Sequence, residues 1–367
     1  MTTDVLRPSL DPASNRLCVI DCDVHPKDSI EDMKPYLAKR WIDYLATYGV
    51  RSRHGFQNGF LYPKSQPQAA RRDSWPPDGG LPASNLKFMQ EQLLDFYDIE
   101  YGVLNFLSPT GQGAQNSDLS VAMAYASNEA HRDRWTGPDK RLKASIVVPY
   151  EDGEASAKEI VRLAGMPDYA QVQLLSRMSE LAGKKRYWPI YEAASELGLP
   201  VGIHVFGYSG WASTNSGWAS YYIEEMAEHC TSCQALLTSL IVEGVFEQFP
   251  KLKIVLIEAG FAWLPALGYR LDKLWKTLRS EVPHLKRAPS EYIRDHVYVT
   301  TQPMEETENP DHLLQIMEWI GWDKILFATD YPHWDFDDPR YTLPPTLSRE
   351  RRRQILSENA RQLYGFA

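Results

Sequence analysis

Asp21-Cys22-Asp23-Val24-His25 follows the apolar run Leu17-Cys18-Val19-Ile20 and places two metal-binding side chains at its end. Asp23 and His25 are two residues apart, and side chains with this spacing point to the same face of a β-strand. Both can therefore approach one metal ion. Asp21 shares this face one layer deeper, where we expect it to support the other two side chains.

Three other short apolar runs end in a residue of the same kind. They are Leu199 to His204, Ile254 to Glu258 and Ile325 to Asp330. The carboxyl ends of parallel barrel strands meet at one face, where the catalytic groups of such barrels lie. Carboxylates buried there are costly unless they are paired, hydrogen-bonded or bound to a metal. The sequence therefore predicts one metal centre with these ligands: Asp23, His25, His204, Glu258 and Asp330.

Short β-branched runs alternate with longer helical patterns along the chain, which is typical of repeated βα units and a parallel sheet. The predicted strands are 17–25, 101–107, 142–148, 169–176, 200–206, 253–258, 297–301 and 324–330. Helical patterns between them include 117–135, 187–197, 262–279 and 310–319. We predict the α/β class and a closed (β/α)8 TIM barrel of the metal-dependent hydrolase type. An open sheet of six or seven strands is the alternative.

A single barrel domain is expected to span residues 1–367, because such barrels often exceed about 250 residues as one unit. Residues 26–85 break the alternation, since they are rich in Pro and Trp and weak in periodicity. An insertion after the first strand lies at the carboxyl-terminal face of a barrel, so we predict that it covers that face. A loop that only covers the barrel or a partner subunit is the alternative. Residues 207–222 form a second, shorter insertion-like stretch.

The composition argues against several classes of partner. The formal net charge of −9 disfavours nucleic acid and anionic membranes. Residues 1–16 lack the apolar core of a signal peptide, and no stretch of about 18 apolar residues occurs. We therefore expect a cytoplasmic protein. Cys230-Thr231-Ser232-Cys233 is a lone CxxC in a helical pattern, which we interpret as packing rather than as a redox or zinc site.

Two further histidines could act at the same centre. His333 follows Asp330 by three residues and could be a ligand, a proton shuttle or a supporting partner, with simple packing as the alternative. His229 lies four residues after Glu225 in a helical pattern, so the two side chains could act together, and we include His229 as a candidate ligand. A solvated helix face is the other explanation for His229.

Substrate-binding residues are predicted from their positions near the barrel mouth. Arg177 follows the fourth strand and could bind a substrate carboxylate as a bidentate fork, or form a surface salt bridge. Trp211, Trp263 and Trp334 are expected to shape a dry pocket for a small molecule.

The chain resembles the amidohydrolase superfamily, in the branch that includes aminocarboxymuconate-semialdehyde decarboxylase and the resorcylate-type decarboxylases. Val19 to His25 resembles the first-strand metal motif of the family, Gly202-Ile203-His204 its fifth-strand histidine, and Phe327 to His333 its eighth-strand aspartate. The segments Glu243 to Pro250 and Asn359 to Phe366 are similar to framework segments. The resemblance covers nearly the whole chain and implies a divalent metal, Zn, Mn or Fe, with one or two ions per chain.

Two positions depart from the family pattern. Asp23 stands where many relatives have His or Glu, and Glu258 stands where the decarboxylases place a catalytic histidine. Glu258 could instead bridge two metal ions, and a carboxylate-bridged pair of Fe or Mn ions is the kind of centre that activates O₂.

The residues support three functional hypotheses. The leading one is a metal-dependent hydrolase or decarboxylase of a small carboxylated substrate, with Asp330, Glu258 and His333 as catalytic residues. The second is a dinuclear Fe or Mn oxygen-dependent hydroxylase, a monooxygenase that needs an electron-donor protein. The third is a non-catalytic partner subunit of an active paralogue. By analogy with the family, we expect a homo- or hetero-oligomer with a similar barrel subunit.

Overall fold

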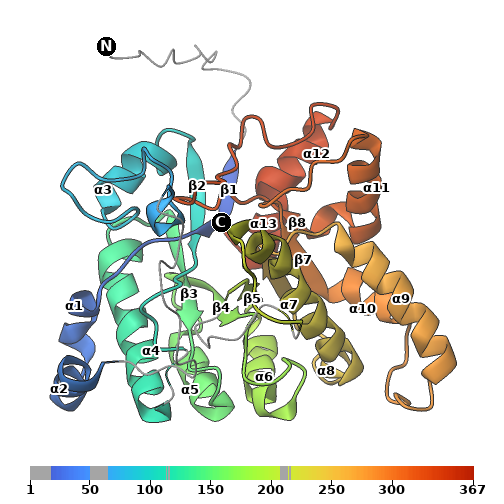
Figure 1. The fold of residues 1–367 in the computed structure, drawn as a ribbon, viewed down its shortest axis with the longest axis horizontal. Helices are drawn as coiled ribbons and strands as arrows, with labels where there is room; N and C mark the ends of the chain where they lie inside the picture. The colour runs from blue at the N-terminus through green and yellow to red at the C-terminus, as the bar shows by residue number, and fades with distance from the viewer. Residues whose placement is uncertain (1–17, 50–64, 113, 115, 207–213, 215) are drawn as a thin grey trace.

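Parallel strands form one sheet with helices around it in the computed structural model, which describes residues 18–49, 65–112, 114, 116–206, 214 and 216–367 (Figure 1). Among these residues the sheet has eight strands, paired in sequence order. The strands are β1 Val19–Val24, β2 Ile99–Leu104, β3 Leu142–Val147, β4 Tyr169–Leu175, β5 Val201–His204, β6 Ile254–Ile257, β7 Val297–Thr300 and β8 Ile325–Leu326. Each predicted strand overlaps one of them.

Backbone hydrogen bonds between β1 and the segment that follows β8 close the sheet. Cys22 N donates to Phe327 O at 2.9 Å, and Asp330 N donates to Asp23 O at 3.1 Å. The segment that continues β8 therefore lies beside β1. The predicted (β/α)8 barrel is confirmed, and the open-sheet alternative is wrong.

Short apolar runs form the strands because both faces of the sheet are covered. Every residue of β5 and of β6 is buried. Parallel strands with helices outside and side chains packed inside read as continuous apolar runs. On β5, Gly202 leaves room for a neighbour, since the side chain of Gln171 lies 2.7 Å from the place that a Cβ would take.

Helices cover the outside of the barrel (Figure 1). The α-helices are α1 Ile30–Met33, α2 Lys39–Tyr48, α3 Leu86–Met89, α4 Ser117–His131, α5 Gly153–Leu163, α6 Trp188–Leu197, α7 Tyr222–Val242, α8 Val245–Gln248, α9 Trp263–Leu278, α10 Pro289–His296, α11 Pro310–Ile320, α12 Arg349–Arg353 and α13 Asn359–Tyr364. Their ends follow local signals. The Asn116 side chain accepts a hydrogen bond from Leu119 N at the start of α4, and Gly198 ends α6 with φ +70°.

The described parts of residues 26–85 pack in two different places. Helices α1 and α2 lie against α4 through one buried cluster: Met33, Leu37, Trp41, Leu119, Met123, Ala126 and Ala130. Residues 69–71 instead run beside the segment after β8, where Ala70 pairs with His333 and Trp334 N donates to Ala69 O at 2.8 Å. The first part thus packs beside the barrel and the second reaches its carboxyl-terminal face. That the insertion as a whole covers this face stays a prediction.

The C-terminal helix α13 packs against the opposite end of the barrel. Ala360 belongs to a buried cluster with Ile20 of β1 and Val255 of β6, near the beginnings of these strands. Tyr364 OH donates to Gln171 Oε1 at 3.0 Å, so this tyrosine reaches into the barrel.

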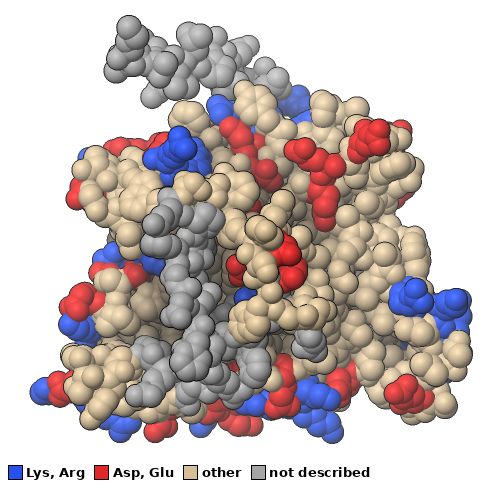
Figure 2. Space-filling model, viewed as in Figure 1, with Lys and Arg blue, Asp and Glu red and all other residues tan. Residues whose placement is uncertain are grey.

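The remaining sequence features lie in ordinary structural settings. The CxxC lies inside α7, where Cys233 is buried, Cys230 is partly buried and both thiols are free. None of the described helices has the length and apolar character needed to cross a membrane. On the face shown in Figure 2, Lys and Arg residues are interspersed with Asp and Glu.

Candidate metal centre

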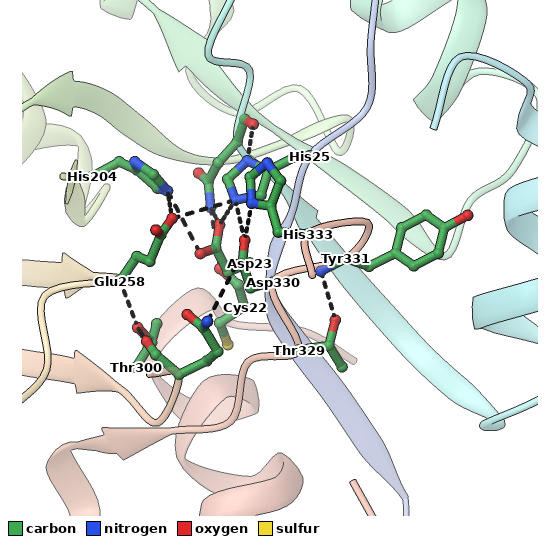
Figure 3. A network of polar contacts seen from close by, with 12 residues as sticks. Cys22, Asp23, His25, His204, Glu258, Thr300, Thr329, Asp330, Tyr331 and His333 are labelled. Carbon is green, nitrogen blue, oxygen red and sulfur yellow. Dashed lines mark hydrogen bonds and ion pairs between the residues drawn. The ribbon is translucent and has the colours of Figure 1, made fainter. Parts of the chain in front are cut away.

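Six ionisable side chains from four strand ends meet at the carboxyl-terminal end of the barrel (Figure 3). Within the described residues they form two overlapping groups, and the ligand atoms of each group all lie within 4.8 Å of one another. The first group is Asp23, His25, His204 and Glu258. The second group is His25, Glu258, Asp330 and His333.

Asp23 of β1 belongs to the first group, and His25, directly after β1, belongs to both. His25 Nε2 is 3.0 Å from Asp23 Oδ1 and 3.0 Å from Asp330 Oδ1. The other ring nitrogen of His25, Nδ1, lies 2.8 Å from the backbone oxygen of Asn105. This contact orients Nε2 toward the centre, as an outer-shell partner does for a metal-binding histidine. The Asn105 side chain also donates to Asp23 Oδ1 at 2.8 Å.

His204 at the end of β5 and Glu258 after β6 face each other. His204 Nε2 is 2.8 Å from Glu258 Oε2 and 3.7 Å from Asp23 Oδ2. His204 Nδ1 is 2.6 Å from Val205 O, which leaves Nε2 as the nitrogen that faces the centre. Glu258 has φ +56°, a left-handed conformation that costs energy for a non-glycine residue and is common at functional sites.

Asp330 links the centre to two residues beyond it. His333 Nδ1 lies 2.6 Å from Asp330 Oδ1, and the His333 ring stacks on His25 with 4.7 Å between centroids. Gln302 Nε2 donates to Asp330 Oδ2 at 3.2 Å and to Asp335 Oδ2 at 3.0 Å. Like Glu258, Asp330 has a positive φ, +61°. The turn after β8 is thereby held in a form that aims Asp330 inward.

Burial and mutual charge set the protonation of the centre. Burial raises the pKa of Asp330 to about 6, and burial together with the charge of Asp330 raises the pKa of Glu258. Burial also opposes the charge on Asp23, yet the charges of His25 and His204 hold its pKa well below its usual range. Burial disfavours the charged form of His204, but Glu258 and Asp23 raise its pKa to about 9. The carboxylates thus depend on a nearby positive charge.

Four atoms that face the centre are buried without a hydrogen-bond partner among the described residues. They are Asp23 Oδ2, His25 Nε2, His204 Nε2 and Glu258 Oε2. The close approaches of His25 Nε2 to carboxylate oxygens therefore lack hydrogen-bond angles. Buried polar atoms of this kind require an explanation, and carboxylate oxygens with imidazole nitrogens are the donor set of Zn²⁺, Mn²⁺ and Fe²⁺. The cluster fits a divalent metal ion.

Two polar residues around the centre were missed from the sequence. Asn105 and Gln302 are fully buried and contact the carboxylates of Asp23 and Asp330. Each follows the apolar run of a strand, β2 or β7, which is the same signal that identified the ligands. Asp21, for which we expected a supporting role, accepts a hydrogen bond at Oδ1 from Thr329 N at 2.9 Å, and this role stays a prediction.

Four predicted residues lie near the mouth but outside the two ligand groups. His229 on α7 is buried but belongs to neither ligand group, because its ring packs against Phe206, which in turn packs against His204. Arg177 lies 3.6 Å from Glu225. Trp263 Nε1 donates to Ala259 O at 3.0 Å, and Trp334 is 41% exposed. Trp211 lies outside the described residues.

Comparison with protein families gives one match over nearly the whole chain. The amidohydrolase family model matches residues 20–366. The chain belongs to the amidohydrolase family. This finding confirms the resemblance noted from the motifs of β1, β5 and the segment after β8, and with it the predicted class of metal-dependent enzyme.

Relatives of this amidohydrolase share its fold at low sequence identity. Gamma-resorcylate decarboxylase of Polaromonas sp. (strain JS666 / ATCC BAA-500) is 25% identical over 293 residues, which cover 74% of this chain and 85% of the relative. The crystal structure of an amidohydrolase from Mycobacterium avium subsp. paratuberculosis K-10 has a TM-score of 0.73 at 22% identity and covers 96% of this chain and 100% of its own. A dihydroxybenzoic acid decarboxylase from Polaromonas sp. JS666, solved with manganese and the inhibitor 2-nitroresorcinol, has a TM-score of 0.67 at 19% identity, with 95% and 97% covered.

Proposed function

We propose that this amidohydrolase is a metal-dependent decarboxylase of a small aromatic carboxylic acid. The observation that carries the proposal is the buried group of imidazole and carboxylate donors at the barrel mouth, with unpartnered atoms turned toward one point. The relatives that are decarboxylases of dihydroxybenzoates support the choice of reaction. Hydrolysis of a related substrate on the same centre is the alternative within this class.

The proposed ligands are Asp23, His25, His204 and Asp330. When bound, a divalent ion supplies positive charge that orients the substrate and polarises one of its oxygens. Asn105 keeps His25 and Asp23 in place through its backbone oxygen and its side-chain amide. The buried walls of the barrel keep bulk water from the reacting carbon.

Glu258 is the proposed proton donor. Decarboxylation breaks the bond between the ring carbon and the carboxylate, releases CO₂, and leaves an electron pair on carbon that a proton must take up. Burial and the charge of Asp330 raise the pKa of Glu258, which favours the protonated carboxyl group that can donate this proton. Glu258 would thus replace the histidine that the decarboxylase branch has at this position. His333, which contacts Asp330, is proposed to support this ligand and to relay protons.

The test measures CO₂ release from 2,6-dihydroxybenzoate by protein loaded with Mn²⁺ or Zn²⁺ in the absence of O₂. We expect stoichiometric CO₂ and the decarboxylated ring product, and we expect Glu258→Gln to lower kcat roughly a hundredfold or more with little change in metal content. Turnover that strictly requires O₂ would contradict the proposal. If the isolated chain turns over no carboxylic acid of this class, the partner-subunit hypothesis gains instead.

A second candidate function rests on the overlap of the two ligand groups. Glu258 belongs to both, and a carboxylate has two oxygens that can bridge two metal ions. His25 belongs to both as well, but its Nδ1 is engaged by Asn105 and leaves one nitrogen for a metal. A Glu258-bridged pair of Fe or Mn ions would make an oxygen-dependent hydroxylase. Elemental analysis separates the two functions: about one ion per chain with anaerobic activity supports the decarboxylase, and about two redox-active ions with O₂ consumption support the hydroxylase.

A further inference from the structure

Two residues at the metal centre have a strained backbone, and they lie on either side of β7. Glu258, after β6, has φ +56°, and Asp330, after β8, has φ +61°. A non-glycine residue keeps a left-handed conformation only where the surrounding contacts hold it. Strand β7 lies between β6 and β8 in the sheet, and among the described residues it contributes no side chain to either ligand group. We therefore ask what the end of β7 contacts.

The end of β7 contacts both strained residues. Glu258 N donates to Thr300 Oγ1 at 3.1 Å (Figure 3), and Gln302 Nε2 donates to Asp330 Oδ2 at 3.2 Å. The Gln302 contact reaches the Asp330 carboxylate itself, whereas the Thr300 contact reaches only the backbone of Glu258. The direction of the Glu258 side chain therefore depends on the backbone of the turn that follows it.

Glu305, in the loop after β7, holds the turn that follows Glu258. Its Oε1 accepts hydrogen bonds from Phe261 N and from Ala262 N, both at 2.9 Å. Gly260 has φ +58°, and a Cβ at this position would lie 2.8 Å from Glu305 Oε1. The carboxylate oxygen thus fits closely against the turn, where only glycine leaves room for it.

The contacts of Glu305 take the place of a local cap on helix α9. Ala262, the residue before this helix, makes no side-chain cap hydrogen bond. A carboxylate at this position satisfies free N–H groups and interacts favourably with the helix dipole. Trp263 Nε1 donates to Ala259 O at 3.0 Å, so a carbonyl group of the turn is fixed as well. The turn therefore has little freedom to relax the backbone of Glu258.

We propose that Glu305 is a positioning residue, which holds the turn after Glu258 so that the Glu258 carboxylate faces the metal centre. Glu258 Oε2 lies 2.8 Å from His204 Nε2, yet it is buried without a hydrogen-bond partner among the described residues. No hydrogen bond at this oxygen fixes the carboxylate, so the turn determines where it points. This inference rests on the proposed function and names a residue on which its proton transfer depends.

A double-mutant cycle between Glu305 and Glu258 tests the proposal. Glu305→Ala removes the acceptor of two N–H groups, and we expect kcat for CO₂ release to fall about tenfold to a hundredfold with KM within about threefold. In the Glu258→Gln background, Glu305→Ala should change kcat less than about twofold, because the group that it positions no longer carries the proton. A cap that only stabilised the fold would give the same fold-change in both backgrounds.

Mn²⁺ binding measured without substrate keeps this test separate from the proposed reaction. A Glu258 carboxylate that turns away from the centre attracts the ion less, so Glu305→Ala should raise the Mn²⁺ dissociation constant about threefold or more. Glu258→Gln should abolish this difference. If the wild-type protein releases no CO₂ from any acid tested, the proposed function fails, and the Mn²⁺ cycle alone decides the role of Glu305.

Conservative and control variants complete the comparison. Glu305→Gln keeps an oxygen that accepts both N–H groups, so it should keep at least about a third of the wild-type kcat and Mn²⁺ affinity within about twofold. Glu305→Asp withdraws the carboxylate by one methylene group and takes the place of Glu305→Ala in the cycle if that variant does not fold. Asp152→Ala removes the cap of α5, where Asp152 Oδ1 accepts from Ala155 N at 3.0 Å, and should leave kcat and Mn²⁺ affinity unchanged.

Two results would overturn the proposal. One is a Glu305→Ala variant with wild-type kcat and wild-type Mn²⁺ affinity. The other is an equal effect of Glu305→Ala with and without Glu258→Gln, which would mean that Glu305 does not act through Glu258.

Discussion

The two ends of this barrel differ in how far their buried polar groups are hydrogen-bonded. At the α13 end, Asn359 Nδ2 donates to Trp322 O at 2.7 Å and to Ile325 O at 2.8 Å, so the amide is satisfied within the chain. At the mouth, Glu258 and Asp330 have positive φ values, and buried ligand atoms lack partners among the described residues. Strain and unsatisfied groups are concentrated where a ligand can compensate them, whereas the other end stabilises the fold.

A chain of hydrogen bonds through the barrel joins these ends. Tyr364 OH donates to Gln171 Oε1 at 3.0 Å, Gln171 Nε2 donates to Asn105 Oδ1 at 3.0 Å, and Asn105 Nδ2 donates to Asp23 Oδ1 at 2.8 Å. Ser145 Oγ also donates to Asn105 Oδ1, at 2.7 Å. Substitutions at the mouth should mainly weaken metal binding. Substitutions near α13 should mainly lower the free energy of unfolding.

The largest effect is expected from Asp330→Asn at the mouth. Removing a charged ligand should reduce metal content and lower kcat/KM by more than about a hundredfold, beyond the loss typical of an outer-shell partner. The metal-free variant should be no less stable than the metal-free wild type, because burial already disfavours the Asp330 charge. Metal analysis and thermal unfolding of both proteins give the comparison. Full activity in Asp330→Asn would remove Asp330 from the ligand set.

Asn105 lies between the mouth and the α13 end of the hydrogen-bond chain. Asn105→Ala should therefore affect both metal binding and stability. Asp23, Ser145 and Gln171 would each lose a partner, which should weaken metal binding about tenfold to a hundredfold and lower the free energy of unfolding by about 1–3 kcal/mol. Ser145→Ala is the matched control, since it removes one hydrogen bond to Asn105 and none to Asp23. A pure stability loss with unchanged metal affinity would show that Asn105 does not orient the ligands.

The third expected effect is a pH-dependent stabilisation by metal. A divalent ion at about 100 times its dissociation constant should stabilise the folded chain by about 2.7 kcal/mol. Protons compete for Asp330, whose pKa burial raises to about 6, so this stabilisation should be present above pH 6 and shrink as the pH falls through that value. Thermal unfolding with and without Mn²⁺ between pH 5 and pH 8 measures it. A metal-induced shift that is constant across this range would contradict the prediction.

The smallest effect is expected from Tyr364→Phe at the α13 end. Loss of one hydrogen bond to Gln171 should lower the free energy of unfolding by about 1 kcal/mol. Metal content and kcat should stay at wild-type values, in contrast to Asn105→Ala. Denaturant unfolding and metal analysis separate the two variants, and a large loss of metal here would mean that the two ends are more tightly coupled than the hydrogen-bond chain implies.

The sequence by itself determined the barrel and most of the residues that meet at the candidate metal centre. In a parallel barrel, apolar runs that end in Asp or His predict that these side chains lie close together, because the carboxyl ends of all strands meet at one face. The family motif at residues 327–333 added Asp330 with its neighbour His333, and the structure brings both beside His25.

Tertiary structure decided which polar residues support the ligands and which lie apart. Asn105 and Gln302 contact the carboxylates of Asp23 and Asp330 across the barrel, whereas the His229 ring packs against Phe206. Helices α1 and α2 of the insertion pack their apolar residues against α4. Strand ends are placed by the regular barrel geometry, but loops and side-chain partners depend on packing between segments far apart in sequence, which local patterns do not encode.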